Sequence, residues 1–249
     1  MPKAATAHHK KKASSTKRVP RELQAARRAR AAKILDELHR LYPKADCALT
    51  HRSALQLLVG TILSAQCTDV RVNIVTVELF KRYRRPADYA DADPRDLEKQ
   101  IQSTGFFRNK TKNLIGMGSV LRERFAGRVP DTMEKLLELP GVARKTANCV
   151  LGTWFKKNEG VVVDTHIGRL ARRLALTWTS RDDKDAVHIE QDLMKVLPRD
   201  AWTFAGHALI WHGRRVCKAR SPNCAECTLA NHCPAAYSFP PPASERRKA

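Results

Sequence analysis

The stretch MEKLLELPGVARKTANCVL, residues 133–151, decides the fold of this 249-residue chain. Leucines at helical spacing precede a Leu-Pro-Gly-Val-Ala turn, and a second helical run follows it. Proline and glycine end helices and permit tight turns, so the stretch predicts two helices joined by a short hairpin. Hairpins of this kind are common in helical proteins, and the turn alone identifies no function.

The turn also predicts an anion-binding site. The N–H groups of Gly141, Val142 and Ala143, and those at the start of the next helix, have no helical acceptor, so we expect them to point outward. The helix dipole favours an anion there, and backbone amides bind phosphate without reading the base sequence. Arg144 and Lys145 follow directly and add positive charge. The hairpin therefore favours contact with the DNA backbone.

Helical periodicity continues on both sides of the hairpin, from about residue 27 to about residue 234. Breakers such as Tyr42-Pro43, Asp93-Pro94 and Leu197-Pro198 separate the apolar runs. The single strand-like run, residues 161–163, is too short to form a sheet alone. We therefore expect an all-α protein of roughly ten helices joined by short loops.

The overall composition indicates a polyanionic partner. The chain has 46 Lys and Arg against 25 Asp and Glu, a net charge of +21. Its 43% apolar content supports a folded core, and its 6% aromatic content argues against β-sandwiches and stacking-based single-strand binders. No run approaches the roughly 18 to 20 apolar residues of a membrane span, and no signal-peptide core is visible. These features predict a cytoplasmic protein that binds nucleic acid and no membrane.

The positive charge is concentrated at the N-terminus. The first 30 residues contain ten Lys or Arg and one Glu, a net charge of +9, and have no apolar period. We expect residues 1–30 to be a disordered basic arm that either follows DNA phosphates or is simply solvated. An organellar transit peptide is an alternative, disfavoured because no amphipathic face is visible. Residues 237–249 predict a second, short tail.

Four of the seven cysteines lie close together near the C-terminus. With spacing C-x6-C-x2-C-x5-C, they are Cys217, Cys224, Cys227 and Cys233. Four thiolates repel one another unless a cation shares their charge, which predicts a metal centre. Disulfides are disfavoured by the odd cysteine count and the lack of a secretion signal. Zinc remains an alternative, but its sites usually pair two short C-x2-C units, so the unequal loops and following proline favour a cubane iron–sulfur cluster.

Four further polar residues near these motifs are candidates for the site. Lys218 and Arg220, between the first two of these cysteines, suit phosphate contacts, with simple solvation as the alternative. Asp164 precedes a helical run, where its carboxylate can accept a proton, stabilise positive charge or cap the helix. Position alone favours the capping role. We expect His166 to support DNA binding by orienting or packing rather than to act as a base.

Three elements, in their order and spacing, resemble the endonuclease III family of helix-hairpin-helix DNA glycosylases. They are the hairpin carrying Lys145, the segment Val163-Asp-Thr-His166, and the four-cysteine tail. The resemblance runs from about Ala31 to Cys233. It implies a bacterial, nucleoid-associated, monomeric base-excision repair enzyme. Its substrate would be double-stranded DNA with damaged bases or abasic sites, from which it removes oxidised pyrimidines before cleaving at the abasic site.

The resemblance also implies two helical domains with the substrate cleft between them. Residues 47–157 would form a six-helix barrel with the hairpin at about 133–152. Residues 31–46 together with 158–236 would form a second helical domain, in which the four cysteines hold a [4Fe-4S] cluster.

The resemblance assigns roles to single residues. Lys145 becomes the amine that attacks the sugar and forms a Schiff base leading to β-elimination, and Asp164 becomes the catalytic carboxylate. A helix N-terminus and the adjacent Arg144 favour the neutral amine that this attack requires. Gln66, in Leu63-Ser-Ala-Gln-Cys-Thr-Asp69, would fill the hole left by a flipped base. Phe106 would enter the duplex from the opposite side as an apolar wedge.

Two other functions remain open at this point. A monofunctional mismatch or adenine glycosylase of the same superfamily uses the carboxylate and a water, and the presence of Lys145 disfavours it. A non-enzymatic iron–sulfur DNA-binding protein would not need both Lys145 and Asp164 at the cleft.

The chain also departs from the family at Ala143, where a second glycine is common. Because alanine adopts positive φ less readily, this change brings the hairpin geometry into question.

Overall fold

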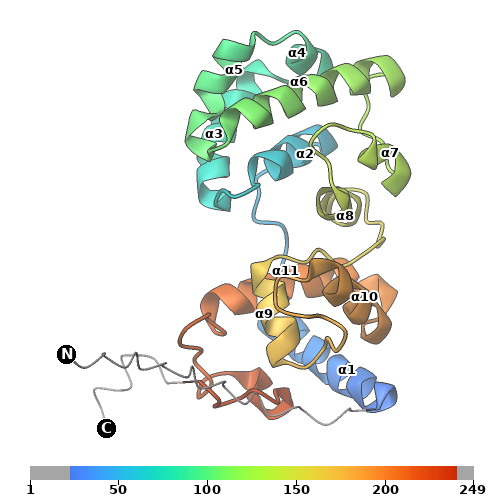
Figure 1. Ribbon diagram of the computed structural model, residues 1–249, viewed down its shortest axis with the longest axis vertical. Coiled ribbons are helices and arrows are strands. Elements are labelled where there is room, and N and C mark those ends of the chain that lie inside the picture. The colour runs from blue at the N-terminus through green and yellow to red at the C-terminus, as the bar shows by residue number, and fades with distance from the viewer. Residues whose placement is uncertain (1–22, 240–249) are drawn as a thin grey trace, which may run out of the picture.

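The computed structural model describes residues 23–239 and is helical throughout (Figure 1). Within this range it contains eleven α-helices, three short 3-10 helices and no strand, which confirms the predicted all-α fold. Residues 161–163 are an extended connection rather than part of a sheet. Residues 1–22 of the expected arm, and 240–249 of the expected tail, lie outside the described residues.

The helices from α2 to α8 form the upper body in Figure 1. In chain order they are α2 (Ala54–Leu63), α3 (Asp69–Arg82), α4 (Pro86–Ala90), α5 (Pro94–Ile101), α6 (Phe107–Arg124), α7 (Met133–Leu137) and α8 (Arg144–Thr153), with the 3-10 helix η1 (Gln102–Thr104) before α6. Local sequence explains where several begin. The side chains of Ser53, Thr68 and Asp93 accept hydrogen bonds from first-turn amides, and proline starts α4 and α5.

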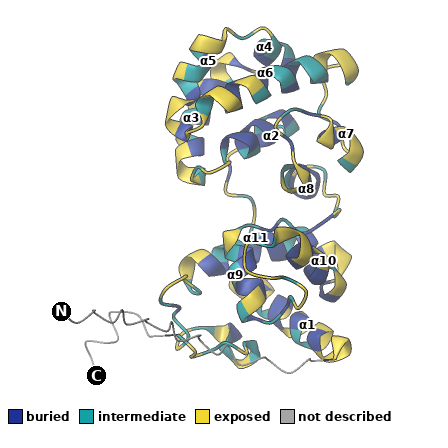
Figure 2. Ribbon diagram, viewed as in Figure 1, coloured by how far each residue is buried: buried dark blue, intermediate teal, exposed yellow. Residues whose placement is uncertain are grey.

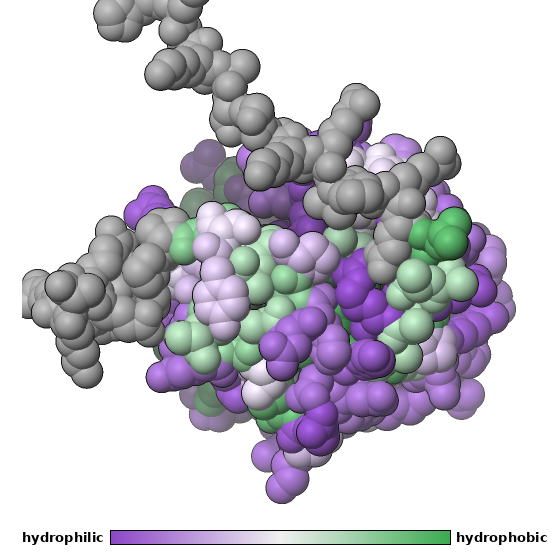
Figure 3. Space-filling model, turned by 90° about the horizontal axis from the view of Figure 1, so that it is seen from below, coloured by the Kyte–Doolittle hydropathy of each residue, from purple (hydrophilic) through white to green (hydrophobic). Residues whose placement is uncertain are grey.

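The lower body in Figure 1 combines the first helix with the C-terminal part of the chain. Its helices are α1 (Gln24–Leu41), α9 (Thr165–Arg173), α10 (Ala186–Val196) and α11 (Trp202–Arg215), with the 3-10 helices η2 (Arg199–Ala201) and η3 (Thr228–His232). Hydrophilic residues cover much of the face of this body seen in Figure 3, with smaller apolar areas among them. Within residues 23–239, no helix is both long enough and apolar enough to cross a membrane.

Helix α1 begins at Gln24, which corrects the expectation that the disordered arm extends to residue 30. The basic residues at its start are bound to the rest of the lower body. The Arg27 guanidinium lies 4.1 Å from the centre of the Trp178 ring, and Arg30 donates to the carbonyls of Leu174 and Ala175. These stacking and hydrogen-bond contacts hold Arg27 and Arg30 against the lower body. Residues 24–30 are therefore part of the folded domain rather than of a solvated arm.

Each body has its own apolar core (Figure 2). The lower core takes side chains from α1, α9, α10 and α11, and the upper core from α2, α3, α5, α6 and α8. Burying each large aliphatic side chain contributes roughly 1.5–3 kcal/mol, so the two cores fix the two bodies separately. The chain crosses between the cores at residues 42–49 and again at 151–161. A cleft forms where the two bodies meet.

Candidate functional site

The cleft between the two bodies brings Lys145 and Asp164 together. Lys145 is the second residue of α8 in the upper body, and Asp164 directly precedes α9 in the lower body. The same cleft is lined by residues 46–49, by Gln66 and by one face of α11. The structure therefore assembles one site from segments that lie far apart in the sequence.

Asp164 is the N-cap of α9. Its Oδ1 accepts a hydrogen bond of 2.8 Å from the Ile167 backbone N–H. Within the described residues its second oxygen accepts no hydrogen bond, and the side chain is half-buried in the cleft wall. The cap fixes the direction of the carboxylate and leaves one oxygen for chemistry, so capping and catalysis are compatible.

Lys145 and Arg144 are neighbours with different surroundings. Arg144 reaches across to α10, where its Nε and Nη2 lie 3.1 and 3.0 Å from Oε1 of the buried Glu190. Asn148, one turn further along α8, donates to the same oxygen at 2.9 Å. Lys145 is exposed, and within residues 23–239 its amine forms no hydrogen bond or ion pair. The arginine joins the two bodies, while the lysine is left to face the cleft.

The hairpin differs in one respect from the sequence expectation. The Val142 N–H, expected to be open, donates to the Leu139 carbonyl at 3.1 Å because the tight turn closes on itself, and the Val142 side chain is buried. Among described residues, Gly141 and Ala143 have amides without acceptors, as do the first three residues of α8. Ala143 has a φ of −98°, so alanine fits there without strain, and the positive φ of 79° falls on Gly141.

The two residues expected to enter the duplex lie on exposed loops of the upper body. Gln66 follows α2, is exposed and reaches the cleft. Phe106 directly precedes α6, and 62% of it is exposed, an unusual state for a phenylalanine that serves only core packing. Both have positive φ, 54° and 49°. His166, by contrast, is half-buried: burial lowers its pKa, and its Nδ1 lies 3.2 Å from Nη2 of Arg169.

One face of α11 lines the cleft and was missed by reasoning from the sequence. The residues concerned are His207, Ile210, Trp211 and Arg214. Arg214 forms an ion pair of 2.7 Å with Asp69 at the start of α3, and so connects the two bodies beside Gln66. The spacing of three, four and seven residues places these side chains on one helix face, which is the only signal that could have found them.

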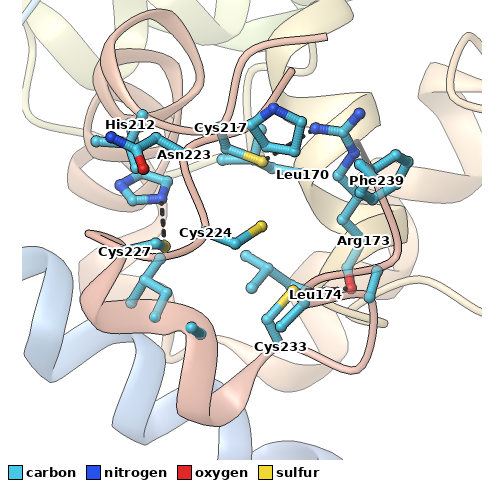
Figure 4. Close-up of a pocket in the computed structure, with 16 residues that line it drawn as sticks. Leu170, Arg173, Leu174, His212, Cys217, Asn223, Cys224, Cys227, Cys233 and Phe239 are labelled. Atoms are coloured by element: carbon cyan, nitrogen blue, oxygen red, sulfur yellow. Dashed lines mark hydrogen bonds between the residues drawn. The ribbon is translucent and has the colours of Figure 1, made fainter. Parts of the chain in front are cut away.

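The four C-terminal cysteines surround one cavity in the lower body (Figure 4). Burial, together with the nearby Cys217, Cys233 and Cys224, raises the pKa of the Cys227 thiol to about 11. Four sulfurs facing one another in an apolar setting become stable thiolates only when a cationic group shares their charge. The donor set therefore fits a metal centre.

The donor set fits an iron–sulfur cluster. All four cysteines line one cavity, and thiolates are the usual ligands of such a cluster.

Arginines from α9 fasten the loop that carries Lys218 and Arg220. Arg169 donates to the Cys217 carbonyl at 3.2 Å, and Arg173 donates to the Lys218 carbonyl at 2.8 Å and to the Cys217 sulfur at 3.3 Å. Lys218 and Arg220 themselves are exposed. The loop is thus held on α9, the same helix whose N-cap is the cleft carboxylate Asp164.

This fold and this site define a class of protein. Residues 59–199 match the family described as HhH-GPD superfamily base excision DNA repair protein. Residues 217–233, which span all four cysteines, match the iron-sulfur binding domain of endonuclease III. The protein therefore carries the predicted [4Fe-4S] cluster.

Relatives of known name narrow the class further. The chain is 51% identical over 214 residues to endonuclease III of Synechocystis sp., covering 86% of this chain and 96% of the relative. It is 35% identical over 206 residues to endonuclease III of Escherichia coli, covering 83% and 95%. The chain belongs to the endonuclease III family, as the sequence resemblance predicted.

Solved structures agree with this assignment. A trapped covalent intermediate of endonuclease III with DNA superimposes with a TM-score of 0.78 and 36% identity, covering 89% of this chain and 99% of that one. A non-covalent endonuclease III complex with DNA gives the same TM-score at 37% identity. A thermostable thymine-DNA glycosylase shares the fold at 18% identity and a TM-score of 0.73.

Proposed function

We propose that this protein removes oxidised pyrimidines from duplex DNA and then cuts the strand at the abasic site, with Lys145 as nucleophile and Asp164 as catalytic carboxylate. As a member of the endonuclease III family, the protein is a base-excision repair DNA glycosylase and abasic-site lyase that binds DNA. The observation that carries the residue assignment is the meeting of these two side chains in one cleft.

The chemistry begins with the amine. Lys145 Nζ attacks C1′ of the damaged nucleotide, and the bond from C1′ to the base breaks as the base leaves. The nitrogen then forms a double bond to C1′ as the C1′–O4′ bond breaks, and O4′ takes up the proton that the amine has lost, which opens the sugar ring and gives a Schiff base. The Schiff base acidifies the C2′ proton, and loss of this proton expels the 3′ phosphate by β-elimination. A related endonuclease III has been trapped as a covalent intermediate with DNA, which supports a nucleophile on the protein.

Asp164 performs two tasks in this scheme. Its free oxygen accepts the proton that the attacking amine loses, and its charge stabilises the positive charge that develops on the sugar. Its capped oxygen stays bound to Ile167, so the carboxylate enters the reaction already oriented. This preorganisation supports Asp164 as the acid–base group.

DNA binding uses groups from both bodies. The open amides of Gly141 and Ala143 are suited to one phosphate, and Lys218 and Arg220 to a second stretch of backbone. Gln66 fills the gap left by the extruded base, and Phe106 wedges into the stack. Arg144 and His166 contribute by holding the hairpin and the cleft wall in place, since their side chains are bound to Glu190 and Arg169.

The ligands of the cluster in this proposal are the four C-terminal cysteines, Cys217, Cys224, Cys227 and Cys233. When bound, the cluster would tie these four cysteines together, and Arg173 holds the loop that carries Cys217 on α9. A Cys224→Ser variant should lose the visible absorbance of the cluster and bind DNA more weakly. Full DNA affinity in a folded variant that lacks the cluster would contradict this structural role.

Borohydride reduction tests the catalytic assignment. A duplex carrying one oxidised pyrimidine is mixed with the protein and reduced, and we expect a covalent adduct that Lys145→Gln abolishes. Base release without an adduct or strand cut would indicate the monofunctional alternative. Binding without base release would indicate a non-enzymatic DNA-binding protein.

We further propose that the protein acts as a monomer on chromosomal DNA at the nucleoid. The cleft is complete within one chain, and no second copy is needed to supply Lys145 or Asp164. Light scattering coupled to size-exclusion chromatography should give a mass close to 28.0 kDa. A mass twice as large, with activity that depends on protein concentration, would argue for a dimer.

A further inference from the structure

Two loops of the upper body share an unusual backbone geometry. The plug loop, residues 64–67, carries Gln66 with a φ of 54°, and the wedge loop, residues 104–106, carries Phe106 with a φ of 49°. Left-handed φ in a residue other than glycine costs about 1–2 kcal/mol. Such positions persist only where surrounding contacts hold them, so both loops need support from the fold.

One buried ammonium provides a contact to both loops. Lys110 lies in the first turn of α6, and only 4% of the residue is exposed. Its Nζ donates to the Leu63 carbonyl and to the Thr104 carbonyl, at 2.8 Å in each case. Leu63 ends α2 directly before the plug loop, and Thr104 is the first residue of the wedge loop. A single side chain thus joins the two loops.

The two carbonyls have few other ways to be satisfied. Both lie at the C-terminal ends of helices, where carbonyls have no intrahelical partner. Within the described residues, neither accepts another hydrogen bond. Burial disfavours the charged amine and lowers the pKa of Lys110, so the core gains no packing advantage from an ammonium over an apolar side chain. Its evident use is to set the spacing of the two carbonyls.

We propose that Lys110 is a positioning residue for base extrusion, which holds the plug loop and the wedge loop at a fixed separation so that Gln66 and Phe106 enter the duplex together. The inference rests on the roles of Gln66 and Phe106 given under the proposed function. Lys110 acts through these loops and does not touch the reacting sugar.

This role predicts a selective effect on catalysis. Extruding a stacked and paired base costs several kcal/mol, whereas an abasic site has no base to unstack. Losing the loop spacing should therefore slow base release from a paired lesion more than strand cleavage at a preformed abasic site. A residue needed only for folding would slow both reactions equally.

The central experiment compares Lys110→Met with Lys112→Met, both on α6. Lys112 is exposed, so its variant removes the same charge without touching the loops. For Lys110→Met we expect base release under single-turnover conditions to fall about tenfold or more, and abasic-site cleavage to fall less than about threefold. Lys112→Met should change the two reactions by equal factors. Equal losses in Lys110→Met would overturn the proposal.

A double-mutant cycle tests whether Lys110 acts through the two loops. In a Gln66→Ala/Phe106→Ala background the side chains to be positioned are gone, so Lys110→Met should add less than about a twofold further loss of base release. A full further loss would overturn the proposal. In the wild-type background, 2-aminopurine placed opposite the lesion should report weaker unstacking in Lys110→Met than in Lys112→Met.

Folding is checked by cluster absorbance and by a cooperative thermal transition. If Lys110→Met fails either check, Lys110→Arg carries the test, because the wider guanidinium keeps the charge and alters the spacing. The same selective loss is expected, and unchanged base release or equal losses would overturn the proposal. Failure of the underlying function gives other results: no base release in the wild type, or full base release in Gln66→Ala/Phe106→Ala.

Discussion

The two helices that begin at the cleft start in opposite ways. Ala143, the N-cap of α8, has no side-chain acceptor, so the first amides of α8 remain open. Asp164, the N-cap of α9, satisfies an amide of its own helix with one carboxylate oxygen. The open N-terminus is suited to an external phosphate, whereas the closed one fixes an acid in the cleft. In the proposed function, the same structural element thus serves binding at one wall and catalysis at the other.

Each of these two helices has side chains that anchor it to other parts of the molecule, in addition to the side chain that faces the cleft. On α8, Arg144 is committed to Glu190 in the lower body, and the adjacent Lys145 is left without a partner among the described residues. On α9, the far end is fastened to the cysteine loop through Arg173. The two proposed catalytic residues are therefore carried on helices whose other contacts fix them in place, as a preorganised site requires.

Replacing the proposed nucleophile of α8 should have the largest effect. Lys145→Gln keeps a polar side chain of similar length and removes the amine, so covalent trapping should vanish and strand cleavage should fall by on the order of 10³-fold or more. Because Lys145 makes no hydrogen bond or ion pair within residues 23–239, thermal stability should be unchanged. Gel analysis after borohydride reduction measures covalent trapping, and a melting curve measures thermal stability. A covalent adduct that still forms in Lys145→Gln would show that another amine is the nucleophile.

The cap of α9 can be separated from its charge by two substitutions. Asn is as good an N-cap as Asp, so Asp164→Asn should keep the free energy of unfolding and lose roughly 10²–10⁴-fold in base release. Asp164→Ala removes both functions and should also lose about 1 kcal/mol of stability. Denaturant unfolding of both variants measures the contribution of the cap to stability, and single-turnover kinetics measures the contribution of the charge to base release. Normal base release in Asp164→Asn would restrict this residue to capping.

The tie between α8 and the lower body should show mainly in stability. Arg144→Met leaves the buried carboxylate of Glu190 with Asn148 alone. Since the Arg144 side chain is half-exposed, we expect a loss of about 1–2 kcal/mol rather than the larger cost of a fully buried pair. The matched Lys145→Gln variant should show no such loss in denaturant unfolding. A variant that weakens DNA binding strongly with no loss of stability would assign Arg144 to the phosphate backbone instead.

Sequence patterns predicted those parts of the molecule that depend on local rules. The all-α fold followed from helical periodicity and breakers, and the cluster from the spacing of four cysteines. The candidates Lys145 and Asp164 were found through motifs, and the structure places them in one cleft. Each of these features is encoded within a short stretch of chain.

Features that depend on distant contacts were not predictable in this way. The first turn of α1, which begins at Gln24, is held by Arg27 stacking on Trp178, a partner about 150 residues away. The pairing of Arg144 with Glu190, and the bonds of Lys110 to Leu63 and Thr104, join separate elements in the same manner. The periodicity of one segment does not show which side chains of a distant segment will contact it.

The smallest effects are expected in the turn before α8. Ala143 has a φ of −98°, which any residue adopts, so Ala143→Gly should change stability by only a few tenths of a kcal/mol and leave DNA affinity within about twofold. Gly141 has a φ of 79°, and an added Cβ would lie 2.8 Å from Cβ of Asn113. Gly141→Ala should therefore cost more, about 1–2 kcal/mol, and weaken binding to an abasic-site duplex. Fluorescence anisotropy with a labelled abasic-site duplex compares the DNA affinity of the two variants. A larger loss in Ala143→Gly would mean that the open start of α8 depends on the alanine side chain rather than on its amide.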